Sequence, residues 1–349
     1  MKWYAGQNLP VTHARPTFSE AWFHQNYGLT FGEKYHREPV FRTEQDQEAL
    51  RLLFGRFGYA GIGERDPRPR PHLEICGHRF MPALFGCEII YQIDQAPSSQ
   101  HLSIGSAADI AAILRPELAT NRWAREFLTQ AHQLSNHYGG VDATINHGGP
   151  INVALSVLGS EALTYLAEDR EVMGRFLDTI TDTIIESYDK LTVAFNPELG
   201  GGRHMFIGNC PVVMLSARTY RETVLPVDLR FRRQVVKFGL HHCGKMDLYV
   251  GDYRELGPLD YIEVGWGSNL ALVRRAFPDA VMDLMINICD LQTMSRATMR
   301  EVITEMVVKA APVSLIRDIW VADIGPDVPD ETILNFVEAV NTALFSARE

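Results

Sequence analysis

Two long segments of the chain repeat apolar residues at helical spacing. The repeating positions are Trp123, Phe127, Ala131 and Leu134 in the first segment, and Met173, Leu177, Ile180, Ile184, Tyr188 and Leu191 in the second. Each stripe predicts an amphipathic helix whose apolar face packs into a core, and the second is long enough for about five turns. The second helix is expected to end at Asn196-Pro197, because proline cannot continue a helix.

Short apolar runs alternate with helical patterns along the rest of the chain. Strands are predicted at 143–145, 205–207, 235–240, 261–264, 281–288 and 313–321, and helices near 245–254, 268–276, 295–309 and 330–345. Nearly continuous apolar strands separated by helices are typical of a parallel sheet that is covered on both faces. Repeating units of about 20 to 45 residues predict an α/β fold, a (β/α)8 TIM-type barrel. The alternative, a doubly wound sheet, lacks the glycine-rich turn expected after its first strand.

The first part of the chain lacks this regular alternation and is rich in aromatic residues and proline. A short helix at Gln45–Phe57 and a strand at Glu88–Tyr91 are predicted within it. We expect one domain over the whole chain, in which 1–100 form an irregular N-terminal elaboration and about 100–349 form the main barrel.

Composition narrows the class of protein. The 349 residues are 46% hydrophobic and 22% charged, which excludes a disordered chain and a coiled coil. No run approaches the roughly 18 apolar residues of a membrane span, and Met1–Asn8 lack the apolar core of a signal peptide. We therefore expect a cytoplasmic protein without a membrane partner. The net charge of −10 argues against a nucleic-acid partner, since phosphate backbones need clustered cations.

Reactive side chains gather where the predicted strands end, which is where barrel enzymes place their chemistry. They are His147, Cys210, His241, Cys243, Glu263, Cys289 and Asp323. Two further cysteines, Cys76 and Cys87, lie in the irregular region and are interpreted as structural.

His241-x-Cys243 is the sharpest of these signals. In an extended segment, residues two apart point to the same side, so that an imidazole nitrogen and a thiolate can approach one ion. Zinc suits this mixed pair. A third ligand is required, and Cys210 and Cys289 are ranked ahead of Asp323 because thiolates match the soft character of such a site. The alternative is a strand end with a buried thiol and no metal.

Two residues are candidates for catalytic roles. His147 is interpreted as a base that faces substrate or supports the site. Glu263 is a candidate partner for an imidazole N–H, with a salt bridge across strand ends as the equal alternative. His242 alternates away from His241 and is expected to pack against the barrel wall.

Several segments together resemble a known superfamily. They are Phe238-Gly239-Leu240-His241-His242-Cys243-Gly244-Lys245, Leu215-Ser216 with Tyr220-Arg221-Glu222 and Val224-Leu225-Pro226, Gly148-Gly149-Pro150, and Ile324-Gly325-Pro326-Asp327-Val328-Pro329-Asp330-Glu331. In order and spacing they are similar to the uroporphyrinogen decarboxylase superfamily, and the first resembles the His-x-Cys-Gly turn of its zinc-dependent methylcobalamin methyltransferases. The resemblance runs from about residue 140 to the C-terminus and implies a (β/α)8 barrel.

The resemblance implies zinc held by His241, Cys243 and a later cysteine, with the cobalamin carried by a separate corrinoid protein. His241 and Cys243 match the motif. The later cysteine does not, because the corresponding stretch reads Val321-Ala322-Asp323-Ile324. The third ligand therefore remains open among Cys210, Cys289 and Asp323.

The leading hypothesis is a zinc-dependent methyltransferase that moves a methyl group between a small substrate or thiol and the corrinoid of a partner protein. A cofactor-free decarboxylase of a porphyrinogen-like acid is the alternative, although the Arg-Gln-Ala-Gly-Arg signature of the decarboxylases is missing. A third possibility is a barrel without catalytic activity that binds a ligand. The superfamily resemblance also implies a homodimer.

Overall fold

Parallel strands form the main sheet of the computed structural model, which describes residues 14–347. The six strands of this sheet follow the order β1 (Ala14–Phe18), β8 (Ile316–Ile324), β7 (Val281–Ile286), β6 (Tyr261–Val264), β5 (Lys237–His242) and β4 (His204–Gly208). A separate antiparallel hairpin joins β2 (Ile89–Gln92) to β3 (Gln95–Ser99). The prediction made for Met1–Asn8 lies outside the described residues.

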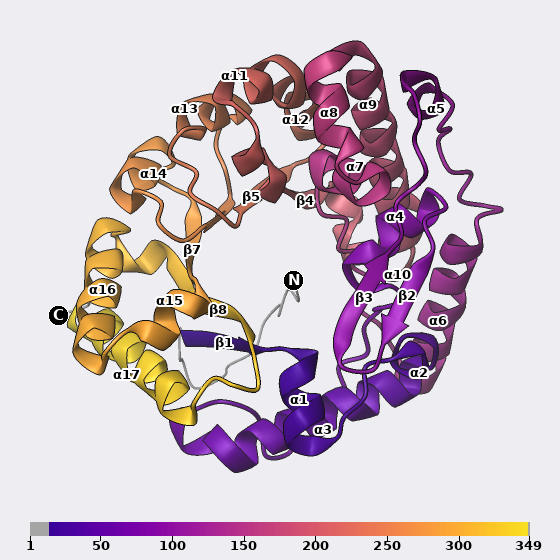
Figure 1. Ribbon diagram of the computed structural model, residues 1–349. Coiled ribbons are helices and arrows are strands. Elements are labelled where there is room, and N and C mark those ends of the chain that lie inside the picture. The colour runs from indigo at the N-terminus through magenta and orange to yellow at the C-terminus, as the bar shows by residue number, and fades with distance from the viewer. Residues whose placement is uncertain (1–13, 348–349) are drawn as a thin grey trace.

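Helices surround these strands in a ring (Figure 1). Their bounds are α1 Glu20–Tyr27, α2 Glu33–Arg37, α3 Pro39–Phe57, α4 Phe80–Leu84, α5 Ala107–Ala111, α6 Arg122–Tyr138, α7 Pro150–Leu158, α8 Glu161–Glu168, α9 Arg170–Ser187, α10 Val193–Phe195, α11 Ala217–Thr219, α12 Leu225–Arg232, α13 Val250–Tyr253, α14 Leu270–Ala276, α15 Ile288–Thr293, α16 Arg296–Lys309 and α17 Asp330–Ser346. Within the described part of the chain, no helix is both long and apolar enough to cross a membrane.

The two helices predicted from apolar stripes form as expected. In α6, the Asn121 side chain accepts hydrogen bonds from the backbone N–H groups of Trp123 and Ala124, and Gly139 ends the helix in the left-handed conformation at φ 80°. The apolar stripe of α6 is buried. The second helix runs from α9 through a wider π-type turn over Tyr188–Thr192, which carries the last apolar positions, into α10, and it ends at Asn196 as predicted.

The predicted α/β barrel class is confirmed, and the strand predicted at 143–145 is wrong. Between β1 and β4, and apart from the β2–β3 hairpin, the described chain makes one isolated bridge, from His72 to Asp142. The segment before His72 alternates proline with other residues, and proline has no N–H to donate to a ladder. This side of the ring therefore carries irregular backbone, and the β2–β3 hairpin lies on it (Figure 1).

The N-terminal segment is more regular than the sequence pattern suggested. The helix predicted at Gln45–Phe57 begins earlier, as α3 at Pro39. β1 pairs in parallel with β8, with Ala14 opposite Ile319, so that residues predicted to lie outside the main barrel supply one strand of its sheet. The shortness of β1 and its Pro16 conceal it from a search for apolar runs.

Register in this sheet sets up the site. His241 of β5 lies opposite Glu263 of β6, and Glu263 lies opposite Asp283 of β7. On the other side, His241 lies opposite Gly208, the last residue of β4. Polar side chains of three neighbouring strands therefore share one level of the sheet.

Candidate metal centre

The end of β4 places Cys210 beside the β5 motif. The Asn209 N–H donates to the His241 carbonyl at 2.8 Å, which continues the β4–β5 pairing by one step. The sequence suggested that Cys210 ends the strand. In the structure, Cys210 instead begins a short helical turn over Cys210–Met214. The turn directs the Cys210 sulfur toward the Cys243 sulfur, 2.8 Å away.

Three donor atoms converge at this point. His241 Nε2 lies 2.8 Å from Cys243 Sγ. The donor atoms of Cys210, His241 and Cys243 all lie within 4.8 Å of one another, and these residues form the one such group of three found in the described residues. One nitrogen and two sulfurs make a donor set that suits zinc, and catalytic zinc sites use three protein ligands with a fourth position left for water or substrate.

The charges of the three groups are mutually dependent. The hydrogen bond from Cys243 lowers the pKa of the Cys210 thiol to about 4 against the opposing effect of burial. The Cys210 thiolate in turn raises the pKa of Cys243. Burial lowers the pKa of His241, but hydrogen bonds with Cys210 and Glu263 outweigh it and raise that pKa to about 10. The arrangement therefore favours a thiolate at Cys210, and the thiolate is the form in which cysteine binds metal.

Glu263 fixes the orientation of the His241 ring. Its Oε2 atom accepts a hydrogen bond from His241 Nδ1, which leaves Nε2 facing the two sulfurs. The sequence analysis named an imidazole N–H as a candidate partner of Glu263, and the structure identifies it as that of His241. Glu263 is 1% exposed, and although burial raises its pKa, the contacts with His241 and Arg15 outweigh this effect and hold the pKa below its usual range. Metal-binding histidines usually have such a carboxylate partner on their second nitrogen.

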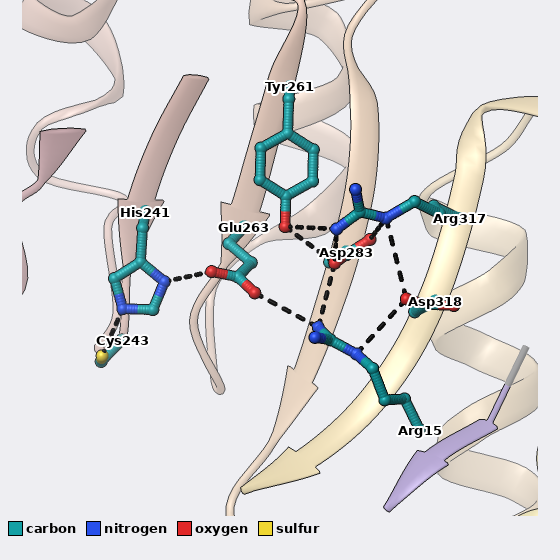
Figure 2. A network of polar contacts seen from close by, with 8 residues as sticks. All are labelled: Arg15, His241, Cys243, Tyr261, Glu263, Asp283, Arg317 and Asp318. Atoms are coloured by element: carbon teal, nitrogen blue, oxygen red, sulfur yellow. Dashed lines mark hydrogen bonds and ion pairs between the residues drawn. The ribbon is translucent and has the colours of Figure 1, made fainter. Parts of the chain in front are cut away.

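Arg15 of β1 reaches the same carboxylate from the opposite side (Figure 2). Its Nη2 atom lies 3.3 Å from Glu263 Oε1 and 3.0 Å from Asp283 Oδ2, and its Nε atom lies 3.3 Å from Asp318 Oδ2. The guanidinium also stacks over the Trp320 ring, 4.8 Å from its centroid. A chain of hydrogen bonds and ion pairs thus runs from β1 to His241.

Arg317 and Tyr261 complete this network around Asp283. Arg317 Nε donates to Asp283 Oδ1 at 3.0 Å, and the Tyr261 hydroxyl donates to Asp283 Oδ2 at 2.7 Å. Asp283 is fully buried, so these donors compensate for the loss of its hydration.

The backbone around Cys243 is closely packed. A Cβ atom on Gly265, just after β6, would lie 2.2 Å from the Gly244 carbonyl oxygen and 2.4 Å from the Cys243 carbonyl carbon. Only glycine allows the β6 end to approach the β5 turn this closely. This contact supports the turn, while the Cys243 side chain itself remains exposed.

A buried polar cluster lies behind Cys210. Asn209 Nδ2 donates to Asp228 Oδ2 at 2.8 Å, and the Tyr220 hydroxyl donates to the same oxygen at 2.9 Å. Asp228 is fully buried, and burial raises its pKa to about 7 despite these two donors.

His242 faces away from the donor atoms of Cys210, His241 and Cys243, as expected. Its Nδ1 lies 2.9 Å from the Tyr253 hydroxyl.

His147 lies in an apolar environment. Its ring is buried, with its centroid 5.2 Å from that of Phe206 and 5.9 Å from that of Phe231. Burial lowers its pKa to about 4, so that the ring is neutral at pH 7. A base of such low pKa accepts protons weakly at neutral pH.

Cys289 and Asp323 are not part of the three-residue group. β7 ends at Ile286, two residues before the predicted end, because the Asn287 side chain caps α15 by accepting from the Cys289 and Asp290 N–H groups. This cap places Cys289 in an exposed first helical turn rather than in the core. Asp323 adopts a left-handed backbone with φ 58°, and its charge contributes to the raised pKa of Cys243.

Sequence reasoning missed the residues that connect to Glu263. Arg15, Asp283, Arg317 and Asp318 were not among the candidates. Asp283 lies inside an otherwise apolar strand, Val281–Ile286, and a charge in such a strand requires a buried partner. A charged residue within an apolar strand was therefore the signal that could have pointed to Asp283, although it does not identify the residue that pairs with Asp283.

Comparison with known proteins agrees with the fold. The family model described as uroporphyrinogen decarboxylase (URO-D) matches residues 77–343, and the chain belongs to this family. A solved structure, a methyltransferase from Methanosarcina mazei, superimposes with a TM-score of 0.61 at 15% identity and covers 94% of each chain. At this identity the likeness concerns the fold. No curated protein sequence matches the chain.

The convergence at Cys210 gives a direct test of the third ligand. Cys210→Ala removes one of the three donor atoms, whereas Cys289→Ala changes an exposed thiol outside the group. We expect Cys210→Ala to lose zinc more readily than Cys289→Ala under the same chelator challenge, measured by residual metal content. The reverse order would favour Cys289, and equal retention in both variants would favour Asp323 or the absence of a zinc site.

Asp228 predicts a pH-dependent stability. Its folded pKa of about 7 exceeds the unfolded value, so between about pH 4 and pH 7 the folded state retains a proton that the unfolded state has released. Stability therefore falls as pH rises through this window, by on the order of 4 kcal/mol from this group. Asp228→Asn should show a smaller loss of unfolding free energy between pH 5 and pH 8 in urea titrations. Parallel pH profiles for the two proteins would contradict the assignment.

Proposed function

We propose that this member of the uroporphyrinogen decarboxylase family is a zinc-dependent methyltransferase. It would move a methyl group between a small substrate or thiol and a corrinoid carried by a partner protein. The convergence of Cys210, His241 and Cys243 at the carboxyl ends of β4 and β5 carries the proposal, because active sites of barrel enzymes form at this end. The methyltransferase of similar fold from Methanosarcina mazei is consistent with it.

The proposed ion would be held by the Nε2 atom of His241 and the sulfurs of Cys210 and Cys243. When bound, zinc supplies Lewis acidity that lowers the pKa of a coordinated thiol or polarises a leaving heteroatom. Glu263 would hold the Nδ1 proton of His241 in place, and zinc would displace the proton on Nε2 in order to bind there. Exposure of Cys243 leaves this edge of the barrel accessible to a methyl donor or acceptor.

The arginines argue against the decarboxylase alternative. A decarboxylase of a porphyrinogen-like acid would need cations free to bind substrate carboxylates. Of the six strands in the described sheet, β1 and β8 contribute arginines, Arg15 and Arg317. Both are engaged with carboxylates of the chain itself. These two strand arginines are therefore not free to bind a substrate carboxylate.

Metal content and methyl transfer test the proposal together. We expect about one zinc per chain in protein purified without an affinity tag, and a sharp loss in Cys243→Ser, since serine is a poor zinc ligand at neutral pH. Cys289→Ser is the matched control and should retain its zinc. The wild type should consume methylcobalamin in the presence of an acceptor from a panel of small thiols, followed by absorbance.

Three outcomes would contradict this function in different ways. Full zinc content in Cys243→Ser would refute the ligand assignment. A wild type that binds no zinc would refute the metal-dependent mechanism. Zinc binding without any methyl transfer would favour a barrel that only binds a ligand.

We further propose that the protein is a homodimer, as is common for soluble enzymes. Light scattering at micromolar concentration should return about twice the chain mass of 39.3 kDa. A measured mass equal to that of one chain would contradict this expectation.

A further inference from the structure

We propose that Arg15 is a positioning residue for the metal centre, acting through Glu263 on His241. The inference rests on the zinc site proposed above and concerns how strongly the three ligands hold the ion. Arg15 lies on β1, far from the His-x-Cys motif in the sequence, and β5 and β1 are separated in the sheet by three strands. Its side chain nevertheless reaches the carboxylate that contacts His241 (Figure 2).

The two oxygens of Glu263 have separate partners. Oε2 accepts from His241 Nδ1, and Oε1 accepts from Arg15 Nη2 at 3.3 Å. The carboxylate is 1% exposed, so water cannot replace a lost partner. Removal of the guanidinium would leave Oε1 buried without a donor, and the carboxylate would no longer be held in the orientation that fixes the His241 ring.

Arg15 is itself held by several contacts. Asp283 and Asp318 lie 3.0 Å and 3.3 Å from its nitrogens, and Trp320 stacks against its guanidinium plane at 4.8 Å. The side chain is 25% exposed, so most of its surface is engaged in these contacts. A lysine could supply the charge but not the planar group that donates to separate carboxylates and stacks on an indole.

Arg317 provides a matched control. It shares Asp283 and Asp318 with Arg15 and is comparably placed, with 38% exposure. The described hydrogen bonds of Glu263, however, come from His241 and Arg15 and not from Arg317. A general loss of packing or charge balance would weaken zinc binding in both Arg15→Met and Arg317→Met. Loss of the contact with Glu263 would weaken it only in Arg15→Met.

The test compares zinc affinity in the full-length wild type, Arg15→Met, Arg15→Lys and Arg317→Met by competition with a chromophoric chelator. We expect Arg15→Met to weaken zinc binding by about 10- to 100-fold, Arg15→Lys to recover part of the loss, and Arg317→Met to change affinity by less than about threefold. The visible absorption of the Co²⁺-substituted protein should shift in Arg15→Met and not in Arg317→Met. Equal effects of Arg15→Met and Arg317→Met would overturn the inference.

A second variant covers the case in which Arg15→Met does not fold, and it also tests the route of the effect. Glu263→Gln keeps the side-chain size and should weaken zinc binding as Arg15→Met does. If Arg15 acts through Glu263, Arg15→Lys in the Glu263→Gln background should cost no further affinity. Additive losses would overturn the inference. A wild type that binds no zinc would refute the proposed metal function as well, whereas zinc binding with equal arginine variants refutes this inference alone.

Discussion

The parallel register of β5, β6 and β7 is the constraint on which the site depends. It places His241 opposite Glu263 and Glu263 opposite Asp283, so that three polar side chains meet at one level. A slip of one residue in any of these strands would move its side chain to the other face of the sheet. The apolar neighbours of these residues oppose such a slip, because the buried side chains of Leu240 and Ile262 would then turn to the face that holds the polar groups. Ordinary hydrophobic burial thus fixes the relative positions of the charged groups.

Charged side chains occupy one level of this sheet, whereas bulky apolar side chains usually fill a barrel. Burial of Glu263 and Asp283 as carboxylates is costly unless cations and hydrogen-bond donors compensate. Arg15 serves both carboxylates at once, and His241 and Tyr261 supply further donors. An ion-pair network of this kind adds little net stability compared with an apolar core. The network instead fixes the orientation of the Glu263 and Asp283 side chains, since each carboxylate oxygen has a defined partner.

The sequence predicted much of the fold and part of the site. Apolar periodicity located α6, α9 and α16 because burial of one helical face leaves a repeating pattern. The irregular side of the barrel was not predictable in this way, because the bridge between His72 and Asp142 leaves no repeat. His241-x-Cys243 was readable because the two residues are neighbours in the sequence at the end of β5. Arg15 was not, since its partners come from β6, β7 and β8 and only the tertiary fold brings them together.

The candidate ligands come from two neighbouring strands, and this arrangement differs from the one that the family resemblance implied. A later cysteine would have supplied a ligand from β8, where this chain has Asp323. Cys210 instead approaches from β4, and its turn is held by the Asn209–His241 backbone bond and the Asn209–Asp228 side-chain bond. A ligand set drawn from β4 and β5 needs no side chain from β8. Asp323 lies outside the group of Cys210, His241 and Cys243, and its charge acts on that group by raising the pKa of Cys243.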